Sequence, residues 1–206
     1  MNPNAKNDTA ITPLSRFLVL ENDEALFTRW HIPKAEIRSA CIICPPLGHE
    51  YTHSYRSLRF LAEALSAAGN LVVTLDYVAT GNATNTQDEI DLPEKWVSNI
   101  SYLSTYITEQ YPELSQTWIG LRAGATFALL ANSKTTQRVD LVLWETIDDG
   151  RKYVRELKAT SRLSVLQQNL DDGSIESAGF LFRKSTVDSL SQINLTTLQS
   201  PLNVNA

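Results

Sequence analysis

The feature that most constrains the fold is an alternation of short apolar runs with amphipathic segments. Four runs are typical of strands buried on both faces, at residues 39–44, 71–75, 117–120 and 139–144. Segments with apolar residues every three or four positions separate or follow them, at residues 55–68, 93–111, 123–131 and 151–162. Strands that alternate with helices build right-handed βαβ units. The sequence therefore predicts an α/β fold in three layers, with helices on both faces of a mainly parallel sheet.

An antiparallel hairpin is predicted ahead of this alternation. Residues 16–20 and 25–30 have the composition of strands, and the polar residues 21–24 between them favour a turn. Mixed sheets often carry such an antiparallel edge. We therefore expect the hairpin to extend the parallel sheet on one side.

The same pattern sets the expected domain organisation. A core of residues 13–165 follows a polar, disordered tail of residues 1–12. Beyond the core the periodicity weakens, so residues 166–206 are expected to be an irregular, lid-like or truncated segment that ends in a polar tail. The length suits one domain with one hydrophobic core.

The charge balance argues against two classes of partner. The chain has 18 Lys and Arg against 23 Asp and Glu, a formal net charge of −5, which disfavours general nucleic-acid binding and a polybasic membrane-surface role. No apolar run reaches the roughly 18 residues of a membrane-spanning helix, and the N-terminal residues lack the apolar core of a signal peptide. We therefore expect a cytoplasmic protein that contacts neither nucleic acid nor membrane.

One segment has the spacing of a catalytic turn. Gly120-Leu121-Arg122-Ala123-Gly124 lies between a predicted strand and a predicted helix, where ligands of open α/β sheets bind. The spacing is that of the nucleophile elbow, G-x-S-x-G, in which a strained turn presents the central residue. Here the central residue is Arg122, whose guanidinium is always protonated and has no lone pair for attack. The sequence thus predicts the geometry of the elbow without its nucleophile.

These residues resemble the α/β-hydrolase family over roughly residues 13–165. Pro45–Glu50 resembles the oxyanion-hole loop of that family. Leu75-Asp76-Tyr77 and Leu143-Trp144-Glu145 resemble more narrowly the serine-aminopeptidase-like proteins called exosortase A system-associated hydrolases. In that subgroup, the resemblance implies, an arginine at the elbow is usual. Arg122 is then expected to be a feature shared with relatives.

The sequence also departs from the family pattern. Ala79 and Asn82 stand where relatives tend to have Gly and Asp. A full α/β-hydrolase continues with two more strands that carry an acid and then a late histidine, whereas the histidines here are His31, His49 and His53. The Ser–Asp–His order cannot be completed after the elbow, so the C-terminal strands are expected to be missing.

Two functions remain open on these grounds. The preferred one is a degenerate hydrolase that acts as a binding or accessory protein for a small acyl or carboxylate ligand, with no cofactor and no metal. The alternative is an unusual ester, thioester or amide hydrolase, in which Arg122 polarises a carbonyl while His49 and Glu50 activate water. The candidate catalytic residues are therefore Arg122, His49 and Glu50. The candidate ligand-binding residues are Gly48, Asp76, Leu121, Ala123 and Asp148.

Each candidate also has a structural interpretation. Arg122 could hold an anion, but we favour an internal ion pair with Glu50 or Glu145, because buried charges need partners. The His–Glu pair could equally order a loop by hydrogen bonds. After the fourth apolar run, Asp148 and Asp149 are well placed to cap the following helix.

Three further groups are expected to be structural. Cys41 and Cys44 lie on one strand and point to opposite faces, so they are packing residues, with Cys44 the one plausible thiol nucleophile. Core positions are predicted for Trp96, Trp118 and Trp144. A basic stripe at helical spacing is expected to be solvated or to dock an acidic partner; it consists of Lys152, Arg155, Lys158 and Arg162. A homodimer is expected to form through this face or through an exposed sheet edge.

Overall fold

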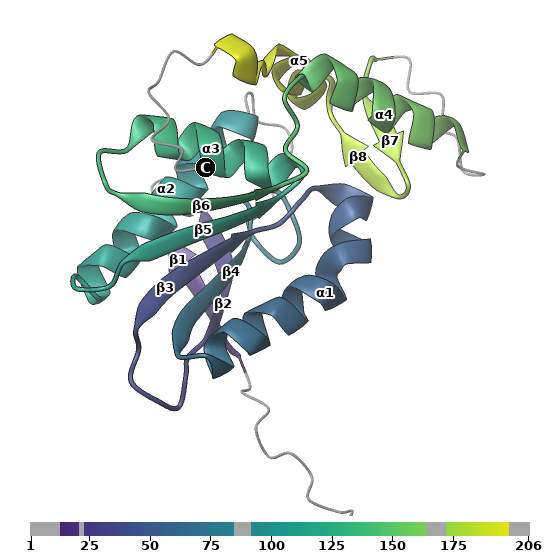
Figure 1. Ribbon diagram of the computed structural model, residues 1–206. Coiled ribbons are helices and arrows are strands. Elements are labelled where there is room, and N and C mark those ends of the chain that lie inside the picture. The colour runs from purple at the N-terminus through teal and green to yellow at the C-terminus, as the bar shows by residue number, and fades with distance from the viewer. Residues whose placement is uncertain (1–12, 21–22, 85–91, 164–171, 198–206) are drawn as a thin grey trace, which may run out of the picture.

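The computed structural model describes residues 13–20, 23–84, 92–163 and 172–197 (Figure 1). A six-stranded sheet forms its centre, in the spatial order β1-β2-β4-β3-β5-β6. The strands are β1 (Leu14–Val19), β2 (Ala25–His31), β3 (Ser39–Cys44), β4 (Asn70–Asp76), β5 (Gln116–Leu121) and β6 (Val139–Trp144). β1, β2 and β4 pair antiparallel in succession, whereas β3, β4, β5 and β6 pair in parallel. The predicted hairpin and the mainly parallel sheet are confirmed.

Helices cover both faces of this sheet (Figure 1). α1 (Gly48–Ala67) lies on one face, and α2 (Leu92–Gln110) and α3 (Ala123–Lys134) lie on the other. The cysteines of β3 mark the two sides, because Cys41 packs in the apolar cluster under α1 and Cys44 packs in the main core. The three-layer prediction is confirmed, and so is the opposite placement of the two thiols.

The last described part of the chain lies over the carboxyl ends of the parallel strands (Figure 1). It consists of α4 (Gly150–Leu163), β7 (Ile175–Ser177), β8 (Phe180–Phe182), α5 (Lys184–Gln192) and a short 3₁₀ helix (Leu195–Thr197). α4 packs against β7 and α5, and the Gly150 amide donates to the Ile193 carbonyl at 2.8 Å. We call these elements the cap.

Within residues 166–206, expected to be an irregular, lid-like or truncated segment, the described residues 172–197 form short elements that the sequence does not predict. β7 and β8 have only three residues each, and α5 places just Thr186, Val187 and Leu190 inward from a mostly polar sequence. Such short elements carry too few periodic apolar positions to be distinguished from loop. The expected polar tails, residues 1–12 and 198–206, lie outside the described residues.

The tryptophans predicted to lie in the core do so, with one exception. Trp96 and Trp118 are buried as predicted. Trp144 is 68% exposed, so its predicted core position is wrong. The register places it beside Leu121 on the α1 face of the sheet, and β6 is the last strand of the sheet in the described part of the chain. Val142, on the same face, is 51% exposed.

Membrane insertion has no candidate element in the described ranges. None of their helices combines the length and the apolar composition needed to cross a bilayer.

Candidate functional site

The turn between β5 and α3 has the backbone of a nucleophile elbow. Arg122 adopts φ 53° and ψ −120°, a strained conformation for a residue with a side chain. The two flanking glycines let the helix approach the sheet. A Cβ on Gly120 would lie 2.3 Å from the Ala125 Cα, and one on Gly124 would lie 2.1 Å from the Cys44 carbonyl oxygen. The elbow geometry predicted from the glycine spacing is therefore present.

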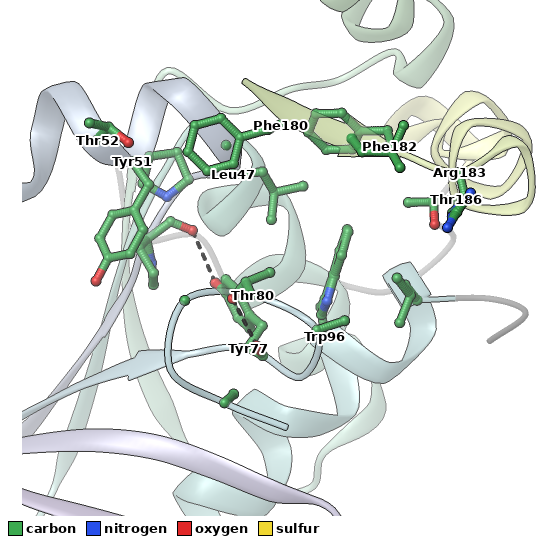
Figure 2. A pocket seen from close by; sticks show the side chains of 18 of the residues that line it. Leu47, Tyr51, Thr52, Tyr77, Thr80, Trp96, Phe180, Phe182, Arg183 and Thr186 are labelled. Atoms are coloured by element: carbon green, nitrogen blue, oxygen red, sulfur yellow. Dashed lines mark hydrogen bonds between the residues drawn. The ribbon is translucent and has the colours of Figure 1, made fainter. Parts of the chain in front are cut away.

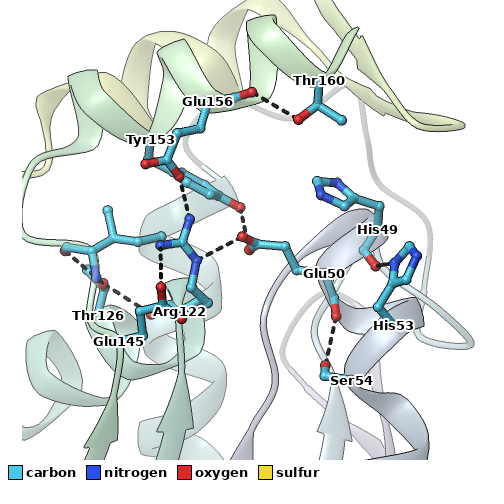
Figure 3. Close-up of polar contacts among 11 residues, drawn as sticks. His49, Glu50, His53, Ser54, Arg122, Thr126, Glu145, Tyr153, Glu156 and Thr160 are labelled. Atoms are coloured by element: carbon cyan, nitrogen blue, oxygen red, sulfur yellow. Dashed lines mark hydrogen bonds and ion pairs between the residues drawn. The ribbon is translucent and has the colours of Figure 1, made fainter. Parts of the chain in front are cut away.

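The Arg122 side chain is held by carboxylates (Figure 3). Its Nε donates to Glu50 Oε1 at 2.8 Å, and its Nη2 bonds the Glu156 carboxylate. Glu145 Oε1 lies 4.0 Å from Nη1. The guanidinium faces the Tyr153 ring, 5.8 Å from its centroid, and the Tyr153 hydroxyl donates to Glu50 Oε2 at 3.4 Å. The predicted ion pair with Glu50 is confirmed.

Arg122, Glu50, Glu145, Glu156 and Tyr153 form a group that we call the elbow cluster. Its electrostatics make it a poor place for an anion. Three carboxylates surround one guanidinium, so the group as a whole is acidic. Burial alone would lower the pKa of Arg122, but the hydrogen bonds to Glu50 and Glu156 outweigh it and raise the pKa. The arginine is thus a fixed cation with its charge already compensated.

His49 and Glu50 lie in the first turn of α1, not in a loop. The helix begins at Gly48, directly after Pro45, Pro46 and Leu47, so the prediction of a loop over these residues is wrong. Successive helical residues point about 100° apart. The Glu50 carboxylate turns to Arg122, and the His49 ring lies apart from it (Figure 3). The His49 backbone carbonyl bonds His53 Nδ1 at 2.8 Å. The structure therefore does not bring the two side chains together as an acid–base pair.

Asp76 holds the loop that follows β4. It is 1% exposed, and its carboxylate accepts from Arg29 Nη1 at 3.1 Å, from the Tyr51 hydroxyl at 3.0 Å and from the Asn82 amide at 3.0 Å. A Cβ on Gly81 would lie 2.4 Å from Asp76 Oδ2, so the loop needs glycine there. Asp76 is saturated by protein donors, which makes it a residue that positions the loop.

The remaining candidates occupy different environments. Asp149 Oδ1 accepts from the Arg151 and Lys152 amides at 2.8 and 3.2 Å, so the predicted helix cap is confirmed. Asp148 lies at the surface, 3.9 Å from Lys152 Nζ. Ala123 is 2% exposed in the core, and Leu121 lines an open hollow beside Arg122. Of the basic stripe, Lys152, Arg155 and Lys158 are exposed, as expected; the Arg162 side chain lies outside the described residues.

Burial decides the reactivity of the cysteine thiols. Cys44 is fully buried, and burial raises the pKa of its thiol well above the ordinary range. Burial also raises the pKa of the Cys41 thiol. Neither thiol is poised as a nucleophile, which agrees with their predicted packing role.

A cavity of about 560 Å³ lies beside the elbow cluster (Figure 2). Its walls are the segment that leads into α1, the loop after β4 and the β7–β8 hairpin, and it includes the predicted ligand residue Gly48. We call it the aromatic cavity, because its side chains include Tyr51, Tyr77, Trp96, Phe180 and Phe182. The Tyr77 hydroxyl donates to the Pro45 carbonyl at 3.2 Å and Trp96 Nε1 to the Val78 carbonyl at 2.9 Å. These bonds hold the Tyr77 and Trp96 side chains in place in the cavity wall.

One end of the aromatic cavity carries polar groups. Arg183 and Thr186 lie there together (Figure 2). Thr186 is 2% exposed, and its Oγ1 has no hydrogen-bond partner in the part of the chain that the structure describes. Buried hydroxyls normally have partners. An unpaired one in a cavity wall favours a ligand with a polar group at this end.

The residues that the cap contributes to the elbow cluster and to the aromatic cavity are not among the candidates predicted from the sequence. Glu156 and Tyr153 lie on α4, and Phe182 and Thr186 lie on β8 and α5. In this region the sequence has a short apolar patch at residues 179–182. Nothing in the sequence alone shows that these segments fold back over the strand ends.

Replacing Arg122 with alanine should lower the free energy of unfolding by about 2 kcal/mol, because it leaves Glu50, whose side chain is 19% exposed, without its cation. Urea denaturation measures the loss. The control is Lys134→Ala, which breaks an exposed pair with Glu94 and should cost no more than about 0.5 kcal/mol. Equal losses in the two variants would contradict a structural role for Arg122.

Comparison with known proteins supports the fold assignment. No family model matches the sequence, and no curated protein matches it. Among solved structures, the chain is similar to an esterase from Pyrococcus furiosus, with a TM-score of 0.66 and 18% identity, over 91% of this chain and 65% of that one. It is also similar to Est1E from Butyrivibrio proteoclasticus with bound ferulic acid. The TM-score is 0.63 and the identity 18%, over 87% of this chain and 72% of that one.

A third likeness is to an α/β serine hydrolase without a lid from Xanthomonas campestris, with a TM-score of 0.50 and 19% identity, over 60% of this chain and 57% of that one. The chain thus spans less than two thirds of the length of the Xanthomonas and Pyrococcus proteins. Identities this low show the fold alone, and that fold is the α/β-hydrolase fold.

Proposed function

We propose that this chain, which has the α/β-hydrolase fold, is a degenerate hydrolase that binds a small acyl or carboxylate ligand without cleaving it. The observation that carries the proposal is the elbow itself. Its backbone is kept, but its central side chain is Arg122, bound by Glu50 at 2.8 Å. A guanidinium cannot form the covalent intermediate that a serine forms at this position.

Among the described residues, no histidine ring is bonded to the elbow in the way that the base of a catalytic triad is. His53 lines the same open hollow as Arg122 and Glu50, but its Nδ1 bonds the His49 carbonyl. In the described part of the chain, no hydrogen bond or ion pair joins a histidine ring to Arg122 or Glu50. Loss of triad members lowers rates by several orders of magnitude even when the rest of the site survives. This favours binding over turnover.

The aromatic cavity supplies the binding site in this proposal. Trp96, Phe180 and Phe182 offer apolar surface for an acyl chain or an aromatic ring, and Thr186 offers a polar contact at one end. A concave, mostly apolar cavity with a few convergent polar groups is the usual form of a small-molecule site. The ligand class that fits is a small molecule with an apolar body and one polar end.

Isothermal titration calorimetry with hexanoate and with ferulic acid tests this proposal. We expect saturable binding of at least one of them, and Phe180→Ala should weaken it about tenfold by removing an aromatic wall. Thr186→Val, which removes only the hydroxyl, should weaken it as well. The control is Phe60→Ala on α1, because Phe60 is 54% exposed and does not line the cavity.

Hydrolysis assays separate the proposal from its alternative. Purified protein should show no turnover of acyl esters and acyl thioesters above buffer. Turnover that disappears in both Arg122→Ala and His49→Ala would instead establish a hydrolase without a serine. Failure of every probe to bind would contradict the proposed ligand class.

A further inference from the structure

A second cavity lies under α1. We call it the α1 cavity; its volume is about 210 Å³, and it lies between α1 and residues of β1, β2, β3 and β4. Pro45 and Tyr51 contribute to both cavities. Neither the elbow nor the cap contributes to its walls, so the function proposed above does not account for it.

Two arginines line the α1 cavity although the chain as a whole is acidic. Arg29 and Arg59 both line it, and no carboxylate is among its lining residues in the described part of the chain. Arg29 directs Nη1 and Nη2 to Asp76, and Arg59 directs Nε to Glu63. A guanidinium has five N–H donors, so these ion pairs leave each arginine with further donors.

His31 provides an independent observation. Its side chain lines the cavity and the residue is 2% exposed. Its Nδ1 has no hydrogen-bond partner within the described ranges. Burial and the nearby Arg59 and Arg29 lower the pKa of the imidazole, against the influence of Glu63, which raises it. A buried ring nitrogen without a partner favours an occupant that has a polar group. The two guanidiniums in the same wall favour an anionic one.

We propose that the α1 cavity is a second ligand site, which binds a small oxyanion group, a carboxylate or a phosphate, between Arg29 and Arg59 and beside His31. Arginine forks match both groups by bidentate, charge-assisted hydrogen bonds. The volume equals that of about seven liquid water molecules, which admits an inorganic anion or a short organic acid. In the described part of the chain, neither Arg59 nor His31 is hydrogen-bonded to the residues of the elbow cluster.

Proton NMR of the histidine rings tests the proposal on the full chain. The chain has three histidines, and single His49→Gln and His53→Gln variants assign the His31 signal. Sodium phosphate and sodium acetate are titrated separately at constant pH and ionic strength. We expect a saturable shift of the His31 signal alone, with an affinity that Arg59→Gln weakens about tenfold or more.

Arg56→Gln is the matched control. Arg56 lies one turn away on α1, over the exposed ring of Phe60, and does not line the cavity. Arg56→Gln removes one positive charge, as Arg59→Gln does, but it should leave the affinity unchanged because Arg56 is not in the cavity wall. Saturation by acetate alone assigns a carboxylate ligand, saturation by phosphate alone assigns a phosphate ligand, and saturation by both assigns a general oxyanion site. Linear shifts of equal size in all three histidines, or equal effects of the two arginine variants, would overturn the proposal.

Discussion

Replacing Arg29 with methionine should lower the free energy of unfolding by about 3–5 kcal/mol, the usual cost of removing one partner from a buried ion pair. Asp76, at 1% exposed, would keep its charge without a cation. The guanidinium also lies over the Phe27 ring, 4.6 Å from its centroid, and methionine keeps an apolar side chain of similar length there without the charge. Urea denaturation at pH 7 measures the effect as a lower midpoint at constant m-value.

Arg59→Met is the control for this variant. Arg59 pairs with Glu63 on the surface, where its side chain is 57% exposed, so its loss should cost about 0.5 kcal/mol or less. The double variant Arg29→Met with Asp76→Asn should recover part of the loss, because it removes the orphaned charge and keeps a side-chain oxygen that accepts from Asn82 or Tyr51. If Arg29→Met and Arg59→Met were equally stable, Asp76 would not depend on Arg29.

Replacing Gly124 with alanine should cost about 3 kcal/mol, at the upper end for an overpacked core. The added Cβ would meet the carbonyl oxygens of Cys44 and Pro45 at 2.1 and 2.4 Å, and backbone atoms cannot turn aside as a side chain can. Helix α3 would have to move away from the segment that leads into α1. The thermal unfolding midpoint of the purified variant measures the loss.

Gly179→Ala separates this collision from the general cost of adding a methyl group. Nothing lies within 4 Å of a Cβ at Gly179, where only the positive φ of 88° penalises alanine. That penalty is about 1 kcal/mol. A Gly124 variant no less stable than the Gly179 variant would show that the elbow does not need its close approach to β3.

The sequence was sufficient to predict the features that depend on neighbours in the chain. The strands of the parallel sheet follow from continuous apolar runs, and the turn at Arg122 follows from two glycines at fixed spacing. The capping role of Asp149 depends only on the two amides that follow it. Each of these signals lies within a few residues of the feature that it predicts.

The parts that could not be predicted depend on segments far apart in the chain. Arg122 meets Glu156 and Tyr153 only because α4 folds across the strand ends. The exposure of Trp144 reflects which strand lies at the end of the sheet, and no local pattern encodes that. α1 begins at Gly48 although Leu47 supplies no side-chain cap, so the usual start signal was missing.

The placement of the tryptophans makes the protein its own optical probe. Trp30, Trp96 and Trp118 are at most 3% exposed, whereas Trp144 projects from β6 into solvent. A water-soluble quencher should therefore extinguish emission from Trp144 selectively and leave the emission of the other three nearly intact. Any molecule that comes to cover β6 should shield that one indole, and its arrival can be followed in unlabelled protein.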